Sequence, residues 1–442
     1  MLSVPRSLNL AFIAVTASRR VSREVAATRS ATVLPFSTAL TTILLPYALS
    51  WACANSFAGR SPGFGFNFLR PLHVNILFFQ NIVSPHQMPY ISCLPGMPGV
   101  DNVIVIVPET NIAERSALGW KTDNILADKR IQIVVAPKIE DIKALFASYE
   151  NRDTWCMFLG ISAFPPLHAW FKLSLKYNVK RGIITEPPFE YGHPLWQHAV
   201  RFFLKDLRYV SRISKIFVMG DRRLGYYRLW SRRWEVIPFM YCTEWRERQA
   251  AALPTADGNR LRLLYVGSLT ARKNVACLLK ACMLLSPTER TRLSIGIVGD
   301  GEQRAMLETM ARSESLRGVG VEFFGTQPMD RIPGIMQQYD ALALPSLHDG
   351  WGAVGNEALT LGLYFLCSDH CGARMLLNRP GNGCTFKAGD ADHLAACLRQ
   401  TINHIEAIRE GINDRIAWSR KNISGHAVAQ RFLSHLISDT QS

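Results

Sequence analysis

Two acidic and two basic residues have the types and the spacing expected of a site for a polar, charged ligand. Asp349 and Glu357 are separated by seven residues in a glycine-rich stretch. Two carboxylates at that spacing can accept hydrogen bonds from hydroxyl groups at opposite ends of one ligand. Arg272 and Lys273 are adjacent at the expected start of a helix. Taken alone, adjacent basic side chains at a helix start are most often solvated surface residues. The alternative is that an arginine fork and a lysine point charge hold a phosphate group.

The stretch that carries the two carboxylates has the pattern of a strand, a turn and a helix. Ala341–Leu344 is a short apolar run, and Val354–Thr360 is the expected helix. In the turn between them, Gly350 and Gly352 allow backbone N–H groups to approach a ligand closely. The N-terminus of the following helix favours anionic or hydroxyl-rich groups. The pattern therefore predicts a ligand site at a strand-to-helix turn.

Short apolar runs alternate with longer amphipathic segments along the chain from about residue 73 onward. This alternation predicts an α/β fold with mainly parallel sheets that helices cover on both faces. We expect strands at 74–79, 103–107, 131–136, 156–159, 182–185, 216–219, 261–266, 293–298, 321–324, 341–344 and 364–368. We expect helices at 139–149, 167–177, 197–211, 275–285, 302–313, 354–360, 392–404 and 425–437.

The alternation occurs in two series, which predicts two doubly wound, Rossmann-like domains that face a central cleft. The polar segment Pro254–Asn259 separates the two series and is the expected linker. In open sheets of this kind, ligands bind beyond the carboxyl ends of the strands, so the cleft is the expected site. The predicted organisation is a poorly structured N-terminal extension over 1–72, one domain over 73–250, a second over 251–424, and a C-terminal helix and tail over 425–442.

The turn with the two carboxylates resembles a pattern of a known protein family. From Pro345 to Ala358 it reads Pro-Ser-x-x-acid-Gly-x-Gly-x-x-x-x-Glu-Ala. This resembles the donor-binding signature of retaining glycosyltransferases of the GT-B fold, in particular family 4 (glycosyltransferase group 1). The family usually has glutamate at the first acidic position, where this chain has Asp349.

Two further turns resemble the family in the same order along the chain. Val266–Asn274 resembles the family turn Gly-Arg-Leu-x-x-x-Lys-Gly, although Ser268 replaces the arginine. Gly299 and Gly301 belong to a stretch that resembles the family's Gly-x-Gly turn. A tight strand-to-helix turn is an alternative explanation for those two glycines. The resemblance is clear over about residues 260–400 and fainter over 73–245.

The resemblance implies a nucleoside-diphosphate-sugar donor on the second domain and an acceptor that enters from the first. Lys273 and Arg272 would neutralise the diphosphate, Glu357 would accept hydrogen bonds from the ribose, and Asp349 would position the donor sugar. The resemblance implies no metal and no cofactor beyond this nucleotide-sugar co-substrate. The predicted donor-binding residues are Gly267, Ser268, Gly299, Gly301, Gly350, Trp351, Gly352, Ala353 and Val354.

The chain also departs from the family pattern. Cys371–Met375 lacks a carboxylate that the family has, and Phe158–Gly160 lacks a histidine that commonly follows that strand. The first turn of the N-terminal domain, Val83–Pro89, lacks the usual glycines. His86 lies in that turn and is included among the predicted catalytic residues, because it could contact acceptor or donor. A surface or capping role is the alternative for this histidine.

Two acidic residues follow another expected strand of the N-terminal domain. Glu186 and Glu190 flank a pair of prolines. Carboxylates at that edge of the sheet could orient an acceptor. Solvated loop acids are the alternative interpretation.

These features predict a retaining, metal-independent enzyme of the hexosyltransferase type. It would transfer a sugar to a glycan, lipid-linked or small-molecule acceptor in polysaccharide or glycoconjugate biosynthesis. A nucleotide-sugar epimerase of the same fold is the first alternative, and it would need acid–base residues around the sugar. A non-catalytic nucleic-acid-binding protein is the second, because the net charge is +15. The chain has no recognised nucleic-acid motif, so we expect no nucleic-acid partner.

The basic charge and the cysteines bear on location. Residues 1–72 hold seven arginines and one acid, a composition compatible with a signal or anchor, a targeting presequence, or an extension irrelevant to the fold. Residues 222–234 mix arginines with aromatic residues, which suits peripheral contact with an anionic membrane. A core-packed helix with a solvated basic face is the alternative. The ten cysteines include no Cys-x-x-Cys pair and indicate free thiols in a reducing compartment. We therefore expect a cytoplasmic protein, either free in the cytoplasm or at the inner face of the membrane.

Overall fold

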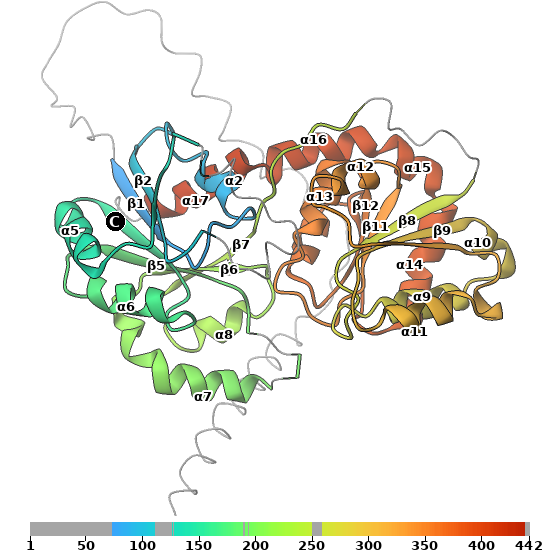
Figure 1. The fold of residues 1–442 in the computed structure, drawn as a ribbon, viewed down its shortest axis with the longest axis horizontal. Coiled ribbons are helices and arrows are strands. Elements are labelled where there is room, and N and C mark those ends of the chain that lie inside the picture. The colour runs from blue at the N-terminus through green and yellow to red at the C-terminus, as the bar shows by residue number, and fades with distance from the viewer. Residues whose placement is uncertain are drawn as a thin grey trace, which may run out of the picture. The chain divides into compact units, whose positions relative to one another are not determined.

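The computed structural model describes residues 73–110, 126, 128–188, 191–192, 194–249 and 259–437. These residues form two parallel β-sheets with helices around them (Figure 1). The predicted extension over 1–72 and most of the predicted linker lie outside the described residues. The predicted domain limits therefore stay predictions, although the strands of one sheet lie between residues 74 and 239 and those of the other between 261 and 386.

The first sheet has seven strands in the order β3-β2-β1-β4-β5-β6-β7, and all neighbouring strands are parallel. The order reverses between β1 and β4, which is the arrangement of a doubly wound sheet. Strand β7 was not predicted, because Glu235 and Pro238 are unusual in a strand. The strand lies at the edge of the sheet, where the missing N–H of Pro238 costs no hydrogen bond to a second neighbouring strand. The strands are β1 (Val74–Phe79), β2 (Val100–Val107), β3 (Gln132–Val135), β4 (Thr154–Leu159), β5 (Lys180–Thr185), β6 (Lys215–Met219) and β7 (Glu235–Phe239).

The second sheet has six parallel strands in the order β10-β9-β8-β11-β12-β13. Strand β13 was not predicted, because a four-residue run that begins with glycine has little strand character. Gly383 is needed there, since a Cβ atom would lie 1.8 Å from the carbonyl oxygen of Phe365. The strands are β8 (Leu261–Val266), β9 (Leu293–Val298), β10 (Gly320–Gly325), β11 (Ala341–Leu344), β12 (Tyr364–Ser368) and β13 (Gly383–Phe386).

Among the described residues all eight predicted helices are present, three with the predicted ends and five with shifted ends, and six further helices were not predicted. The helix expected over 197–211 ends at Lys205, and a 3-10 turn covers Leu207–Arg212. The helices are α2 (Met88–Ile91), α5 (Ile139–Tyr149), α6 (Pro165–Ser174), α7 (Leu195–Lys205), α8 (Leu224–Arg228), α9 (Val275–Met283), α10 (Pro287–Thr291), α11 (Arg304–Ala311), α12 (Ile332–Met336), α13 (Val354–Thr360), α14 (Ala391–Asn403), α15 (Ile405–Glu410), α16 (Ile412–Asn422) and α17 (Gly425–Ile437).

Both faces of each sheet are buried, as continuous apolar strands require. In β1, Ile76 and Phe78 point into one core cluster, whereas Leu77 and Phe79 point into another. Helices α5 and α6 supply the second cluster, and α2 and α17 supply the first. The second sheet is covered by α9, α11 and α14 on one face and by α12 and α13 on the other.

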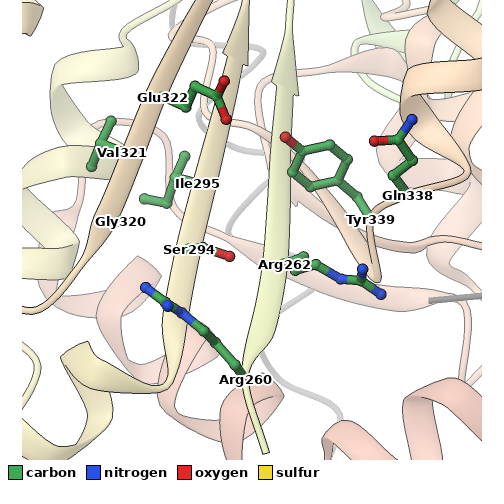
Figure 2. Close-up of a pocket in the computed structure, with 9 residues that line it drawn as sticks. All are labelled: Arg260, Arg262, Ser294, Ile295, Gly320, Val321, Glu322, Gln338 and Tyr339. Atoms are coloured by element: carbon green, nitrogen blue, oxygen red, sulfur yellow. The ribbon is translucent and has the colours of Figure 1, made fainter. Parts of the chain in front are cut away.

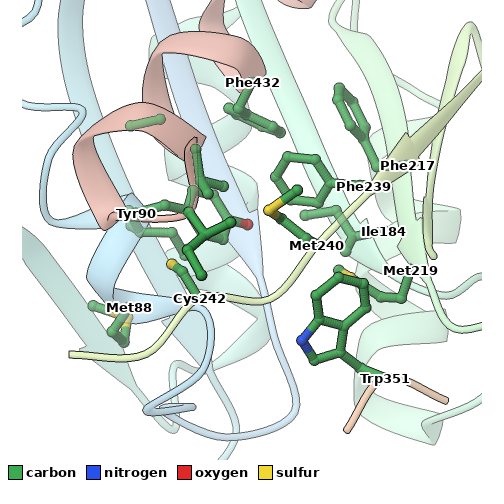
Figure 3. Packing of buried hydrophobic residues seen from close by; sticks show 14 of the residues in the cluster. Met88, Tyr90, Ile184, Phe217, Met219, Phe239, Met240, Cys242, Trp351 and Phe432 are labelled. Carbon is green, nitrogen blue, oxygen red and sulfur yellow. The ribbon is translucent and has the colours of Figure 1, made fainter. Parts of the chain in front are cut away.

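The last helix, α17, packs on the first sheet although it follows the second sheet in the sequence. The ring of Phe432 lies 4.9 Å from that of Phe217 and 5.6 Å from those of Phe78 and Tyr90 (Figure 3). At the start of the helix, a Cβ atom on Gly425 would lie 2.2 Å from a backbone oxygen of the α2 segment. The C-terminal helix is therefore part of the core of the first sheet.

Candidate functional site

The turn after β8 and the loop after β11 meet at the carboxyl edge of the second sheet. The backbone N–H of Leu347 donates to the carbonyl oxygen of Arg272 over 2.8 Å. The Arg272 guanidinium donates to the carbonyl oxygen of His348, also over 2.8 Å. Parallel strands β8 and β11 are neighbours in the sheet, so the segments that follow them emerge side by side. The two predicted cations and the predicted acidic loop thus lie together.

Lys273 and Asp349 form an ion pair within this contact. The Lys273 Nζ atom lies 2.5 Å from an Asp349 carboxylate oxygen, and the two side chains are 16% and 14% exposed. Both groups keep some access to solvent. A charge-assisted hydrogen bond of this kind is stronger than a neutral one. A bound anion could replace Asp349 as the partner of Lys273, which would leave the carboxylate available for hydroxyl groups.

Glu357 lies in the first turn of α13 and is half-buried. Burial raises the pKa of Glu357 from 4.5 to about 7, and the charge of Arg246 acts in the opposite direction. Within the described part of the chain, no hydrogen bond to the Glu357 carboxyl group is found. An acidic group held half-ionised near neutral pH without a protein partner is suited to a ligand that brings hydroxyl groups.

The loop between Asp349 and α13 presents backbone rather than side chains. The N–H groups of residues 350–354 donate to no acceptor among the described residues. The Trp351 side chain is only 2% exposed, and its indole N–H donates to Asn356 over 2.7 Å. Figure 3 shows the indole ring in the core beside Met219. Any donor contact of Trp351 would therefore be made by its backbone, and the same holds for the glycines on either side.

Gly299 and Gly301 allow the turns after β8 and β9 to approach closely. A Cβ atom on Gly299 would lie 1.9 Å from the carbonyl oxygen of Gly267, and one on Gly301 would lie 2.6 Å from that of Leu269. The carbonyl oxygen of Ser268 accepts a hydrogen bond from the Tyr265 hydroxyl group. Backbone packing accounts for these glycines, and their predicted contact with a donor stays a prediction.

Three residues of the first sheet's loops contact one another near this loop. The Tyr241 hydroxyl group donates to a Glu186 carboxylate oxygen over 3.3 Å, and its ring lies 6.4 Å from that of His86 and 6.5 Å from that of Trp351. A Cβ atom on Gly350 would lie 2.0 Å from a Glu186 carboxylate oxygen. Glu186 is thus exposed and lies against the Asp349 loop, and the His86 ring lies beside Tyr241. Glu190 lies outside the described residues.

Sequence reasoning missed Tyr241. It follows β7, a strand that was itself not predicted, and it lies 55 residues from Glu186 in the sequence. Its carbonyl oxygen accepts a hydrogen bond from Asn356 of α13 over 3.1 Å. Burial raises the pKa of Tyr241 above its usual value, and Glu186 raises it further. No spacing along the chain could have indicated this residue, because all its partners come from distant segments.

Two further contacts connect the loops of the first sheet with those of the second. Arg374 forms an ion pair of 2.9 Å with Asp221, which follows β6. A Cβ atom on Gly220 would lie 2.8 Å from the Cα atom of Gly372, so the two backbones nearly touch. The segment Cys371–Met375, which departs from the family pattern, is therefore held by contacts with the first sheet's loops.

The structure offers no residue cluster suited to a metal within its described ranges. No group of three or more His, Cys, Asp or Glu side chains that could hold an ion is found there. The nine cysteines that the structure describes are free thiols. The predicted absence of a metal stays a prediction.

A pocket of about 400 Å³ lies at the opposite edge of the second sheet (Figure 2). Its lining residues stand at or just before the first residues of β8, β9, β10 and β11. Ligands of doubly wound sheets bind at the carboxyl ends of the strands, so this pocket is separate from the candidate site. It is lined by Arg260, Arg262, Ser294, Ile295, Gly320, Val321, Glu322, Gln338 and Tyr339.

Comparison with solved structures defines the fold. The chain resembles HepE of Anabaena in complex with UDP, with a TM-score of 0.58 and 14% identity over 83% of this chain and all of that one. It resembles the lipopolysaccharide outer core galactosyltransferase WaaB equally, with a TM-score of 0.58 and 14% identity over 83% of this chain and 99% of that one. The two Rossmann-like, parallel-sheet domains therefore form the GT-B fold.

The sequence comparison concerns the second sheet. Residues 247–410 match the model of the family described as "Glycosyl transferases group 1". The amylovoran biosynthesis glycosyltransferase AmsK of Erwinia amylovora is 30% identical over 144 residues, which are 31% of this chain and 35% of that protein. The chain thus spans about a third of the length of the curated relatives it matches. The matched region contains Arg272, Lys273, Asp349 and Glu357.

Proposed function

We propose that the protein is a glycosyltransferase that uses a nucleoside-diphosphate sugar as donor and retains the configuration of the transferred sugar. The observation that carries the proposal is the ion pair between Lys273 and Asp349, which lies within the segment that matches the glycosyltransferase family model. A cation and an acid of this kind can serve the two halves of such a donor, its diphosphate and its sugar hydroxyl groups.

In the proposed complex, the diphosphate replaces Asp349 as the partner of Lys273. Arg272 adds a second positive charge, although its present hydrogen bond to the His348 carbonyl group also orders the loop. Glu357 accepts hydrogen bonds from the ribose, and Asp349 with the amides of residues 350–354 positions the sugar. The N–H groups of these residues donate to no described acceptor, which supports this role.

The proposed reaction breaks the bond between the anomeric carbon and the β-phosphate oxygen. The acceptor hydroxyl oxygen forms the new bond to that carbon on the same face, and its proton passes to the departing phosphate oxygen. Lys273 and Arg272 stabilise the negative charge that develops on this phosphate. The proposal needs neither a protein nucleophile nor a metal for this step. Burial of the donor would exclude water and limit its hydrolysis.

The acceptor is proposed to approach beside Glu186. This carboxylate lies against Gly350, and Tyr241 donates a hydrogen bond to it. A carboxylate held in this way can accept a hydrogen bond from an acceptor hydroxyl group and fix its direction. The relative AmsK is named for amylovoran biosynthesis, so we propose a glycan or lipid-linked acceptor in polysaccharide or glycoconjugate formation.

The proposal is tested by presenting the full-length protein with nucleotide sugars. UDP-glucose is the first donor to test, because HepE has been solved in complex with UDP and with UDP-glucose. A donor present at one hundred times its Kd should stabilise the protein by about 2.7 kcal/mol against unfolding. Release of UDP and NMR of the product's anomeric proton then report transfer and stereochemistry.

Two outcomes would contradict the proposal. If no nucleoside-diphosphate sugar raises the melting temperature and none is turned over, the donor assignment fails. If an epimerised nucleotide sugar forms without any acceptor, the protein is an isomerase of the same fold. Inversion at the anomeric carbon would refute retention alone.

A further inference from the structure

Helix α7 presents an apolar stripe to solvent. The side chains of Trp196, Val200, Phe203 and Leu204 are 59%, 36%, 49% and 68% exposed. Their spacing of four, seven and eight residues places them on one side of a helix. Phe202 is the one buried residue of α7. A helix that buries one large side chain and exposes four presents an apolar surface that its own fold does not use.

The opposite side of α7 is anchored to the first sheet's domain. The ring of Phe202 lies 4.6 Å from that of Trp230 and 5.9 Å from that of Trp234. The segment after α8 therefore runs beside α7, and its residue Leu229 is 46% exposed. Because the anchoring contacts are made by Phe202, the exposed stripe is free to contact something else without loss of these contacts.

The same region holds about half of the net charge of the protein. Residues 195–234 contain ten Lys and Arg residues and two acids, a net of +8 out of +15. Asp221 is already paired with Arg374, and burial raises the pKa of Asp206. Seven of the cations are exposed and form no ion pair with any residue that the structure describes: Arg201, Lys205, Arg208, Arg212, Arg228, Arg232 and Arg233.

We propose that α7 and the segment after α8 dock the protein on an anionic lipid bilayer. The stripe of Trp196, Val200, Phe203 and Leu204 would enter the boundary between headgroups and acyl chains, while the cations contact lipid phosphates. This combination of an apolar helical stripe with flanking Lys and Arg residues is what binding in the plane of a membrane requires. The inference does not depend on the proposed enzymatic function.

Other occupants fit these observations less well. A second copy of the chain would bring two surfaces of +8 together, and this repulsion disfavours self-association. A nucleic acid would use the cations but would leave the aliphatic side chains of Val200 and Leu204 without an apolar partner. A bilayer surface is complementary to both the charge and the stripe.

The structure also corrects the membrane segment expected at residues 222–234. Tyr227 and Trp234 are buried in the core and cannot enter a bilayer. This segment contributes its arginines and Leu229, whereas α7 contributes the main apolar surface. Among the described residues, no helix is long and apolar enough to span a membrane.

Sedimentation of the full-length protein with large unilamellar vesicles tests the proposal. We expect binding to vesicles that contain one third phosphatidylglycerol, and at least tenfold weaker binding to pure phosphatidylcholine. The double variant Phe203→Ser/Leu204→Ser should reduce binding to the anionic vesicles at least tenfold, since it removes two apolar side chains that are buried only in the bilayer. Arg201→Gln/Lys205→Gln should reduce it several-fold, and the loss should be greatest at low salt.

The controls change matched residues on the second sheet's helices. Leu284→Ser and Met306→Ser remove exposed apolar side chains, and Arg312→Gln removes an exposed cation. These variants should bind vesicles as the parent protein does. Equal binding to both lipid compositions, or unchanged binding by the α7 variants, would overturn the proposal. A concentration-dependent dimer that Leu204→Ser abolishes would instead identify a second copy as the occupant.

Discussion

The loops of the two sheets differ in how their candidate residues are arranged along the chain. On the second sheet, Arg272 and Lys273 occupy one turn, and Asp349 and Glu357 occupy one strand-turn-helix segment. On the first sheet, the corresponding group consists of His86, Glu186 and Tyr241, which follow three different strands. Residues of one turn or one strand-turn-helix segment keep a fixed spacing along the sequence. Residues that come from separate loops have no such spacing. The difference explains why the proposed donor side could be predicted from the sequence and the proposed acceptor side could not.

The largest effect is expected for Lys273→Ala on the second sheet. Loss of the cation that we propose stabilises the departing phosphate should reduce the transfer rate by about 10²- to 10³-fold. Steady-state transfer of the sugar from UDP-glucose, or from whichever donor is accepted, is the measurement. Lys280→Ala, an exposed lysine on the helix that follows, is the matched control and should leave the rate unchanged. A Lys273→Ala enzyme of near-normal rate would remove this lysine from the donor site.

The next effect concerns Glu357 and its dependence on pH. Its carboxyl group has a pKa of about 7 in the folded protein against 4.5 when exposed, so the folded state holds a proton that the unfolded state has lost. Stability should therefore fall as the pH rises from 4.5, the pKa of the exposed group, to about 7, its pKa in the folded protein. Glu357→Gln removes this penalty and should raise the free energy of unfolding at pH 8 by roughly 2–3 kcal/mol, with little change at pH 5.

Denaturant titrations at the two pH values measure the Glu357 effect. Glu406→Gln, which changes an exposed glutamate on α15, should show no such difference between pH 5 and pH 8. The same Glu357→Gln protein should bind UDP more weakly, because an amide is a poorer acceptor for ribose hydroxyl groups than a carboxylate. A variant that gains no stability at pH 8 would show that burial does not raise the pKa of the Glu357 carboxyl group.

A smaller effect is expected on the first sheet's side of the comparison. Glu186→Gln should lower the ratio of transfer to donor hydrolysis by about tenfold, which is the value of one charge-assisted hydrogen bond to an acceptor hydroxyl group. The affinity for UDP should not change. Glu244→Gln, an exposed glutamate of the same half, is the control. Equal ratios for both variants would exclude Glu186 from acceptor positioning.

The smallest effect on stability is expected for Gly350→Ala. Gly350 lies where the Asp349 loop of the second sheet contacts Glu186 of the first sheet's loops. The new Cβ atom would lie 2.0 Å from a Glu186 carboxylate oxygen, so this flexible side chain must move. We expect a change in unfolding free energy below about 1 kcal/mol, together with a loss of transfer that is not additive with Glu186→Gln. In contrast, Gly372→Ala places its Cβ atom 2.4 Å from a backbone oxygen and should destabilise the protein more.

Most helices and strands could be predicted from the sequence, and the elements that were missed have physical explanations. Buried parallel strands are continuous apolar runs, so β1, β8, β9 and β12 were predicted near their observed ends. The strand β7 was missed because it contains a proline, and β13 because it begins with a glycine that packing against Phe365 requires. The six-residue helix α15 has too few turns for a clear period, and the eleven-residue helix α16 is so polar that it has no continuous apolar stripe.

The predicted site residues show the same contrast: the sequence indicated which residues matter, but not which of them contact one another or are buried. Lys273 and Asp349 were predicted separately, and the structure brings them into contact. Trp351 was predicted within the donor loop, but its side chain is part of the core. Glu186 was predicted only as one of two interpretations, and the structure places it against Gly350.

The sequence by itself determined the two series of strands and helices and the turns that carry the predicted donor residues. These are local properties, set by apolar periodicity and by glycines at fixed positions. The tertiary structure alone decided that Tyr241 contacts Glu186, that the Glu357 carboxyl group has no hydrogen-bond partner among the described residues, and that α7 leaves an apolar stripe in solvent beside seven exposed cations. These properties depend on which distant segments pack together, and burial and partnership are defined only once the chain has folded.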